Sequence, residues 1–305
     1  MLHADTATNL AYAMDVPSYS LVSARFTYLA SELAARVRSD WGVSLPFVGS
    51  SLTVMATGPA SDTYDPNYTP PFHGFAFANS GPNPVAGQTN GVCIEPALGL
   101  DYTELELVLN VPTNAYAFSL KFNFFSAEYP AYTNSIYNDR FMIRLTSQAF
   151  DGNVAFDSLG HAVSANTAYF AVTNGAELVG TGYDDAGAAA IGWQTVLRTV
   201  TPGETITLKF LIFDVSDRID DSAAVIDAFQ WINQPVPVLV SIFHAVEISW
   251  PSEINQNYQV EWTQELTQNV WSNLGSVVSG SGTTNSVFDS TRDATHKFYR
   301  VLTAP

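Results

Sequence analysis

The sequence has a single cysteine, Cys93, among its 305 residues. No intrachain disulfide can form, and zinc sites built on several thiolates are excluded. Apolar residues flank Cys93, so we expect a buried and unreactive thiol. If the protein works outside the cell, its stability must therefore come from the size of its core, to which a bound metal ion could add.

Basic residues are also scarce. Lys and Arg number 12 against 29 Asp and Glu, which gives a formal net charge of −17. A field of this sign repels phosphate backbones and anionic lipid surfaces, so we expect no nucleic-acid partner. The same field attracts divalent cations. The alternative is that the bulk acidity only keeps the protein soluble.

Long apolar runs are absent. No stretch of 18 or more apolar residues occurs, so the sequence predicts no transmembrane helix and no membrane span. The first residues lack the basic and apolar regions of a signal peptide. If the protein is exported, we expect the sequence to begin after a removed signal.

The familiar catalytic motifs are missing as well. The sequence contains no G-x-S-x-G elbow, no H-E-x-x-H pair and no glycine-rich phosphate loop. The histidines are scattered and suggest no metal site: His3, His73, His161, His244 and His296. We therefore expect no enzyme of these classes, and a non-enzymatic role is favoured.

What the sequence does contain is a β pattern. Hydrophobic residues make up 47% of the chain, and polar and apolar residues alternate over many short stretches from about Leu45 onward. Strands are predicted over 51–58, 104–111, 117–125, 141–145, 168–172, 205–213 and 225–231. A short helix is predicted over 8–14, with Thr6 or Thr8 as its cap. Residues 29–38 could form a helix or a strand, and the proline-rich stretch 59–96 is expected to be a long loop.

These patterns predict an all-β protein in two parts. Residues 1–234 are expected to form a large, jelly-roll-like antiparallel β-sandwich that carries the short helix. Two prolines near residue 236 indicate a stiff linker. Residues 238–305 are expected to form a small second β-sandwich, with strands near 238–243, 245–250, 258–262, 270–275, 286–289 and 298–302.

Carboxylates gather where two of the most apolar strands end. Glu128, Asn138 and Asp139 follow the strand at 117–125, and a run of aspartates, 214–222, follows the strand at 205–213. If these strands are neighbours, the two loops, 126–139 and 214–222, converge. Like charges held this closely repel one another unless a cation is bound.

Calcium fits such a cluster, because it takes six to eight oxygen ligands. We predict a structural Ca²⁺ site formed by Glu128, Asn138, Asp139, Asp214, Asp217 and Asp221. The first alternative is that the Asp and Asn side chains only cap turns. The second is a hydrolase that uses Glu128 with a neighbouring Asp.

Aromatic residues in loops are a further candidate for recognition. Packing is the favoured role for them, and stacking on a sugar or a partner is the alternative. The residues concerned are Tyr64, Tyr68, Phe72, Tyr132 and Tyr137.

Several of these segments resemble a known family. Residues 118–132 (FSLKFNFFSAEYPAY) and 138–141 (NDRF) are similar to the S-F-x-Y-x-F-A-S-E-E-Y-P-E-Y…N-D-x-F signature of the choice-of-anchor L domain. Residues 206–223 resemble its later K-L-A-I-A-D-x-x-D-x-x-x-D-S-A segment, and residues 9–14 its opening. The resemblance covers about residues 5–232. Ala127 stands where the family has the first Glu of its E-E pair, which removes one potential ligand.

The resemblance implies a location more than a reaction. Members of the family are secreted bacterial surface proteins, held to the envelope by varied C-terminal sorting signals. In this chain the tail instead resembles a fibronectin type III-like module, at 246–252, 258–262, 271–275 and 298–301. Such a module implies a spacer or docking role.

The sequence thus predicts a secreted or cell-surface binding or adhesion protein with structural calcium, whose partner is an extracellular glycan, a protein or a second copy of itself. A glycan-binding or glycan-hydrolysing protein is the second hypothesis. A self-assembling surface or filament subunit is the third.

Overall fold

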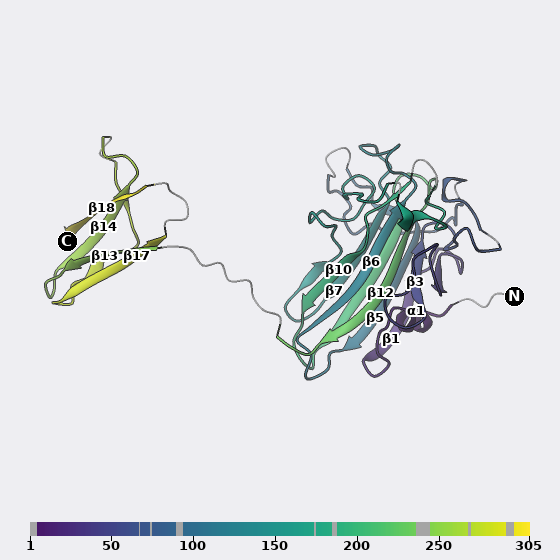
Figure 1. Cartoon of the computed structure of the whole chain (residues 1–305), viewed down its shortest axis with the longest axis horizontal. Helices are drawn as coiled ribbons and strands as arrows, with labels where there is room; N and C mark the ends of the chain where they lie inside the picture. The colour runs from purple at the N-terminus through teal and green to yellow at the C-terminus, as the bar shows by residue number, and fades with distance from the viewer. Residues whose placement is uncertain are drawn as a thin grey trace. The chain divides into compact units, whose positions relative to one another are not determined.

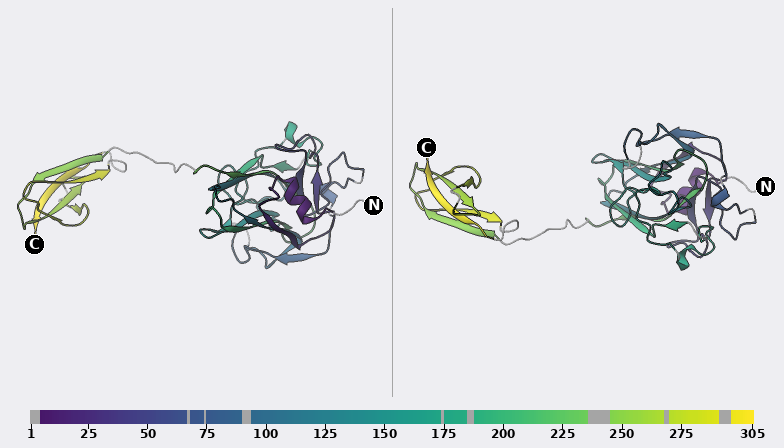
Figure 2. Two further views of the ribbon diagram at one scale, coloured as in Figure 1. Left: turned by 90° about the horizontal axis from the view of Figure 1, so that it is seen from below. Right: turned by 90° about the horizontal axis from the view of Figure 1, so that it is seen from above.

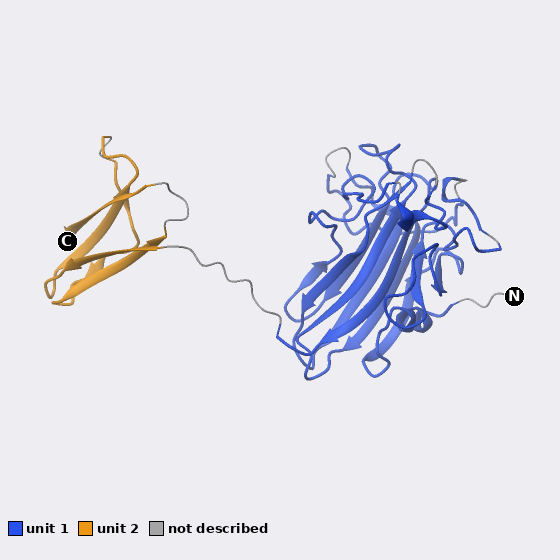
Figure 3. Ribbon diagram, in the orientation of Figure 1, with its two compact units in different colours: residues 1–236 blue, residues 237–305 orange. Residues whose placement is uncertain are grey.

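The computed structural model describes residues 5–66, 68–73, 75–89, 94–173, 175–184, 188–235, 245–267, 270–290 and 296–305. The chain divides into two compact units, residues 1–236 and 237–305 (Figure 3). This division falls where the sequence predicts the linker. Cys93 and the strand predicted over 238–243 lie outside the described residues.

Unit 1 begins with the predicted helix, α1 (Ala7–Ala13). Thr6 is its cap, because its side chain accepts a hydrogen bond of 3.1 Å from the amide of Asn9. One face of the helix, with Leu10 and Ala11, is buried in the core. The helix contacts strands of both sheets and so closes one side of the sandwich, as the end-on views of Figure 2 show.

In the described residues, the strands of unit 1 form two six-stranded antiparallel sheets. The first has the order β1-β5-β11-β7-β8, with β4 also paired to β5. Its strands are β1 (Leu21–Tyr28), β4 (Ser80–Pro82), β5 (Leu98–Asn110), β7 (Arg140–Thr146), β8 (Asp151–Asn153) and β11 (Thr205–Asp214).

The second sheet has the order β10-β6-β12-β3-β2, with β9 also paired to β6. Its strands are β2 (Ala35–Arg38), β3 (Leu52–Ala56), β6 (Ala117–Ser126), β9 (Ala189–Ala190), β10 (Gln194–Thr199) and β12 (Ser222–Ile232). Strands that follow one another in the chain repeatedly change sheet, as β5, β6 and β7 do. The predicted all-β, jelly-roll-like sandwich is confirmed.

The core follows from strand periodicity. Successive side chains of a strand point to opposite faces, so every second residue of β11 enters the space between the sheets. Ile206, Leu208 and Phe210 meet Phe122 and Phe124 of β6 there. The outer face is covered as well, since Phe125 of β6 packs in a second cluster with Trp41.

The central strands bring the two acidic loops to one end of unit 1. β6 ends at Ser126 and β11 ends at Asp214, while β7 begins at Arg140 and β12 begins at Ser222. All four points lie at the same end, because β12 pairs antiparallel with β6 and β11 with β7. Figure 1 shows the connecting loops crowded at this end of the sandwich.

Some local predictions are wrong. The strand predicted over 168–172 does not form. The amide of Ala168 bonds to the carbonyl of Ser164 and that of Tyr169 to the carboxylate of Asp157, and Val172 makes only an isolated bridge, to Ala190 of β9. Residues 29–38 form no helix and contribute only the short β2. The stretch 59–96 is mostly loop, as predicted, with a single 3-10 turn (Pro71–His73) and β4 among its described residues.

Unit 2 has its own small core between two sheets. One sheet pairs β13 (Ala245–Pro251) with β17 (Thr284–Ser290), and in the other β14 (Asn257–Thr263) pairs with β15 (Ser272–Asn273), β16 (Val278–Ser279) and β18 (Phe298–Ala304). Trp250 of the first sheet packs with Tyr258 and Val260 of the second. Among the described residues of the chain, no helix has the length and apolar character needed to cross a membrane.

Candidate functional site

The two acidic loops meet at the loop-rich end of unit 1. Ser222 at the start of β12 is paired with Ser126 at the end of β6, and its hydroxyl bonds at 3.0 Å to the hydroxyl of Ser126. The same hydroxyl donates to Oδ2 of Asp139 at 2.8 Å. The amide of Ala127 donates to the carbonyl of Asp221 at 3.2 Å. Hydrogen bonds therefore connect loops whose bonded residues are 83 or more positions apart in the sequence.

Four carboxylates come together beneath these loops: Glu128, Asp139, Asp214 and Asp221. None is more than 2% exposed. Pairing of β11 with β7 aligns Phe213 with Arg140, which brings Asp214 next to Asp139. We call these four residues the carboxylate cluster.

Most of the oxygens of the cluster lack a hydrogen-bond partner of normal geometry. Both oxygens of Asp214 and of Asp221, Oδ1 of Asp139 and Oε1 of Glu128 are buried without one. A buried polar atom normally finds a partner, and a buried charge costs much more when it is left unpaired. The Phe75 amide lies near Asp221, and the side chains of Thr57 and Asp139 lie near Asp214, but none of them reaches normal hydrogen-bond geometry with these oxygens.

The electrostatics of the cluster are those of crowded negative charge. Burial and then the charge of Asp221 raise the pKa of Asp214 well above its ordinary range. Burial and then Asp214 do the same to the pKa of Asp139. Burial, followed by the charge of Asp139, raises the pKa of Glu128 to about 10. Burial raises the pKa of Asp221 to about 8, against a lowering effect of the nearby Phe75 amide.

The two nearest arginines do not neutralise the cluster. Arg140 donates to Oε1 of Glu95 at 2.6 Å. Burial alone would raise the pKa of Glu95, but the hydrogen bond and charge of Arg140 hold it below its ordinary value. Arg218 pairs with Asp101 and also donates to the carbonyl of Asn79 at 2.7 Å. Two ways of removing the charge are left: the carboxyls keep their protons, as their raised pKa values favour, or a cation from solution binds.

The donor chemistry fits calcium. All of the free atoms are carboxylate oxygens, which are the ligands that Ca²⁺ prefers, and thiolate or imidazole ligands are not among them. Among the described residues, no three or more acidic, His or Cys side chains already surround one point as metal ligands do. The carboxylates, which repel one another, would have to turn inward to bind an ion.

Two of the predicted ligands lie elsewhere. The side chain of Asn138 donates to Oε1 of Glu95 at 2.7 Å and accepts from the amide of Asn166 at 2.9 Å, so it belongs to the Glu95–Arg140 network. Asp217 lies further out, where it lines a surface cavity above Glu128. Its charge contributes to the raised pKa of Glu128.

Other residues of the site were not predicted. Tyr183 is buried, and burial followed by the charges of Asp221 and Asp139 raises its pKa well above the ordinary value. Gly58 lies so close to Asp221 that a Cβ added there would be 1.9 Å from Oδ2 of Asp221. Both come from distant parts of the sequence, and no local pattern marks them. Ser222, by contrast, directly follows the aspartate run and could have been included.

The cavity above the cluster has a volume of about 160 Å³. Its lining residues are Glu128, Tyr132, Tyr137, Asp217, Ile219 and Asp220. The rings of Tyr132 and Tyr137 meet edge to face with their centroids 5.7 Å apart. Two of the predicted recognition aromatics therefore lie at the mouth of the carboxylate cluster.

The remaining loop aromatics lie over glycines or beside the core. An added Cβ at Gly180 would come within 2.5 Å of the ring of Tyr64, which is itself 65% exposed, and one at Gly182 within 2.6 Å of the hydroxyl oxygen of Tyr68. Both glycines have positive φ, a backbone conformation that favours glycine. Phe72 packs beside the cluster around Trp41.

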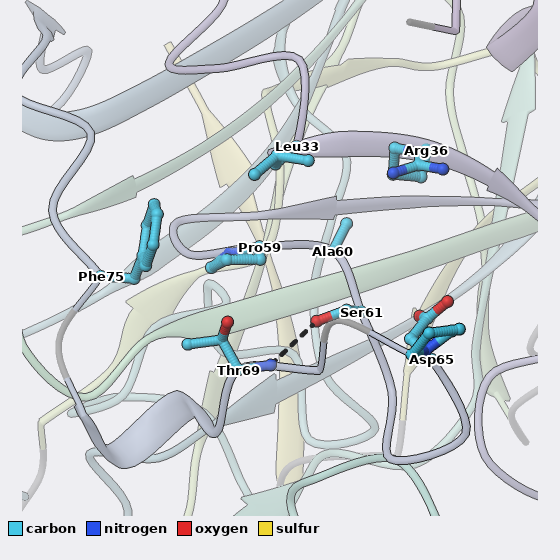
Figure 4. A pocket seen from close by; sticks show the side chains of 9 residues that line it. Leu33, Arg36, Pro59, Ala60, Ser61, Asp65, Thr69 and Phe75 are labelled. Carbon is cyan, nitrogen blue, oxygen red and sulfur yellow. Dashed lines mark hydrogen bonds between the residues drawn. The ribbon is translucent and has the colours of Figure 1, made fainter. Parts of the chain in front are cut away.

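A second cavity, of about 310 Å³, lies beside the loop 59–69 (Figure 4). Leu33, Pro59, Ala60 and Phe75 give it a largely apolar wall, and the amide of Thr69 donates to the hydroxyl of Ser61 at 3.5 Å. Its acidic residue, Asp65, is paired with Arg38. No free carboxylate of the cluster lines it, so it carries no argument for the cation site.

No family model, curated protein or solved structure matches this chain. The similarity of its motifs to the choice-of-anchor L domain, and of its tail to fibronectin type III, therefore stays a prediction. The residues of the carboxylate cluster and the cavity above it are the features of the chain that bear on function.

Proposed function

We propose that this chain is a secreted or cell-surface binding protein whose larger unit holds one structural Ca²⁺ ion. The observation that supports this is the set of buried, partnerless oxygens of Glu128, Asp139, Asp214 and Asp221. An ion there would offset the repulsion of the cluster and hold the loops after β6 and β11 together.

An extracellular setting agrees with such a site. Calcium modules outside cells bind with dissociation constants of about 0.1 to 1 mM, a concentration range that extracellular calcium supplies. The motif resemblance to secreted bacterial surface proteins points the same way. The proposed role is binding or adhesion, with the fibronectin type III-like unit 2 as a spacer or docking module.

The hydrolase hypothesis is less favoured by the geometry. A carboxylate pair that cleaves a glycosidic bond needs one acid that keeps its proton and one ionised partner in a polar setting. Burial raises the pKa of Glu128, Asp139 and Asp214 alike. The cluster thus lacks the division into one protonated and one ionised group.

Thermal unfolding of the full chain tests the proposal. A free calcium concentration about 100 times Kd should add about 2.7 kcal/mol to the free energy of unfolding. For a unit of this size the corresponding rise in Tm is roughly 5–10 °C relative to EDTA. Magnesium at the same concentration should raise Tm less, because it demands a tight octahedral site. Equal melting temperatures in EDTA and in calcium at about 100 times the weakest expected Kd of about 1 mM would refute the calcium site.

A further inference from the structure

The cavity above the carboxylate cluster has a composition of its own. Its wall carries the acidic side chains Asp217 and Asp220 and the tyrosines Tyr132 and Tyr137, and none of the described residues that line it is basic. Glu128 forms part of its lining although the residue is only 1% exposed, and its Oε1 is partnerless. The cavity therefore joins the buried cluster to the surface.

Asp217 and Asp220 keep their charges uncompensated. Among the described residues, neither forms an ion pair, and the neighbouring Arg218 is turned to Asp101 and Asn79. Within the described part of the chain, Asp217 accepts one hydrogen bond, and it is local: the amide of Ile219 donates to its Oδ1 at 3.3 Å. Both aspartates are half-buried at the cavity wall, so their field is less screened than that of a fully exposed pair.

The tyrosines add a second cation-favouring element. The face of an aromatic ring attracts a cation, and a guanidinium also stacks on it. Tyr132 is 42% exposed, so part of its ring is open to a ligand. Ile219, which is 53% exposed, offers an apolar surface for the methylene stem of a long basic side chain.

The size of the cavity restricts the ligand. About 160 Å³ is smaller than the roughly 300–1,000 Å³ of pockets for drug-sized molecules. It suits one side chain or one small ring. An anion is excluded by the charge of the wall, and a neutral ligand would leave Asp217 and Asp220 without a counter-charge.

We infer that this cavity binds the side chain of an arginine presented by a partner protein, with Asp217 and Asp220 accepting hydrogen bonds from the guanidinium and Tyr132 and Tyr137 flanking it. The inference rests on the proposed binding function and names the chemistry of its partner. The net charge of −17 would also speed the approach of a basic surface. Arginine is favoured over lysine because its planar group can bond to carboxylates in pairs.

The test uses N-acetyl-arginine amide as probe and N-acetyl-citrulline amide as its neutral isostere. Binding to the full chain is followed by NMR chemical-shift titration in saturating calcium. Asp217→Asn and Asp220→Asn should each lower the affinity for the arginine probe by about tenfold, which is the loss expected for one charge-assisted hydrogen bond. Asp151→Asn, which removes one exposed carboxylate far from the cavity, should leave its affinity unchanged. The citrulline probe should bind the wild-type chain no more tightly than the arginine probe binds the Asp217→Asn and Asp220→Asn variants.

Other results would overturn the inference. Equal affinity for the arginine and citrulline probes would show that binding in the cavity does not depend on the charge of the ligand. Binding of methyl α-D-glucopyranoside in place of arginine, weakened by Tyr132→Ala, would assign the cavity to a glycan. Two calcium ions per chain, reduced to one by Asp217→Asn, would assign it to a second metal. A normal calcium-dependent Tm shift without arginine binding would refute this inference alone, whereas arginine binding without any Tm shift would refute only the calcium site.

Discussion

The backbone amide of Asp139 donates a 2.9 Å hydrogen bond to Oε2 of Glu128, and the other oxygen of that carboxylate, Oε1, is buried without a partner. One bond fixes the direction of the side chain, while the second oxygen remains available. Asp139 has the same arrangement: its Oδ2 accepts a hydrogen bond from Ser222, and its Oδ1 is buried without a partner. In the proposed calcium site, the unused oxygens are the ones that would bind the ion.

Asp214→Asn should have opposite effects with and without calcium. In EDTA the variant should unfold at a higher temperature than the wild type, because Asp214 must either stay ionised in a repelling cluster or take up a proton on folding, and each lowers stability at neutral pH. In calcium it should lose most of the stabilisation, because an amide is a weaker ligand than a carboxylate. Thermal melts of both proteins in both buffers check this. A variant that is less stable than the wild type in EDTA would contradict the role of repulsion. Asp151→Asn is the control, because it removes a carboxylate outside the cluster.

Gly58→Ala should weaken calcium binding through Asp221. The added Cβ would stand 1.9 Å from Oδ2 of Asp221, so the carboxylate must move. Calcium titration of the variant should give a lower affinity or no binding, with the fold kept as judged by circular dichroism. Gly152→Ala is the matched control, because the nearest atom to its added Cβ is the ring of Phe150 at 3.2 Å, remote from the cluster. Equal calcium affinity in Gly58→Ala and wild type would place Asp221 outside the ligand set.

Ser222→Ala should destabilise unit 1 by about 1–3 kcal/mol, the usual cost of leaving buried polar partners unsatisfied. Its fully buried hydroxyl bonds to Ser126 and donates to Oδ2 of Asp139. Urea denaturation measures the change. Ser39→Ala, at an exposed position, should alter the free energy of unfolding by less than about 0.5 kcal/mol. Equal effects of the two substitutions would show that the Ser222 hydroxyl does not support the cluster.

A separate carboxyl pair predicts a pH dependence of stability. Burial, followed by a hydrogen bond and the charge of Asp227, raises the pKa of Asp15 to about 6. Asp227 itself accepts from the amides of Phe47 and Ala228, each at 2.6 Å. The folded chain holds the Asp15 proton more tightly than the unfolded chain. The penalty for ionising Asp15 is therefore absent below the ordinary value of 3.8 and complete above about 6, so stability falls as the pH rises through this interval.

The Asp15→Asn variant isolates this effect. Asn tolerates the positive φ of 70° found at this position. The wild type should lose stability relative to the variant between about pH 4 and about pH 6 in urea titrations made in saturating calcium. A constant difference between the two proteins across this interval would show that Asp15 does not carry the proton.

The sequence predicted the part of the fold that strand periodicity controls. Alternation in 205–213 and 117–125 located β11 and β6, because both strands send every second side chain into the core. β1 was missed, since it lies at the edge of its sheet, where no side chain of the strand is fully buried. The segment at 168–172 was predicted as a strand from its apolar and aromatic residues, but Phe170 packs on Tyr129 from a loop.

The carboxylate cluster was predictable where it follows strand ends. Glu128, Asp139 and Asp214 directly follow or precede paired strands, so their convergence follows from the sheet order. Asn138 illustrates the limit of that reasoning. Its neighbour Asp139 points to the cluster, while Asn138 points to Glu95, a residue from the long loop whose position no periodicity gives. Gly58 and Tyr183 were missed for the same reason.

Calorimetric titration of calcium into the EDTA-stripped full chain tests the central claim most directly. We predict one ion per chain with a dissociation constant of about 1 mM or tighter, and loss of that binding in Asp214→Asn. Absence of binding heat in the wild type up to about 10 mM calcium, ten times the weakest expected constant, would contradict it.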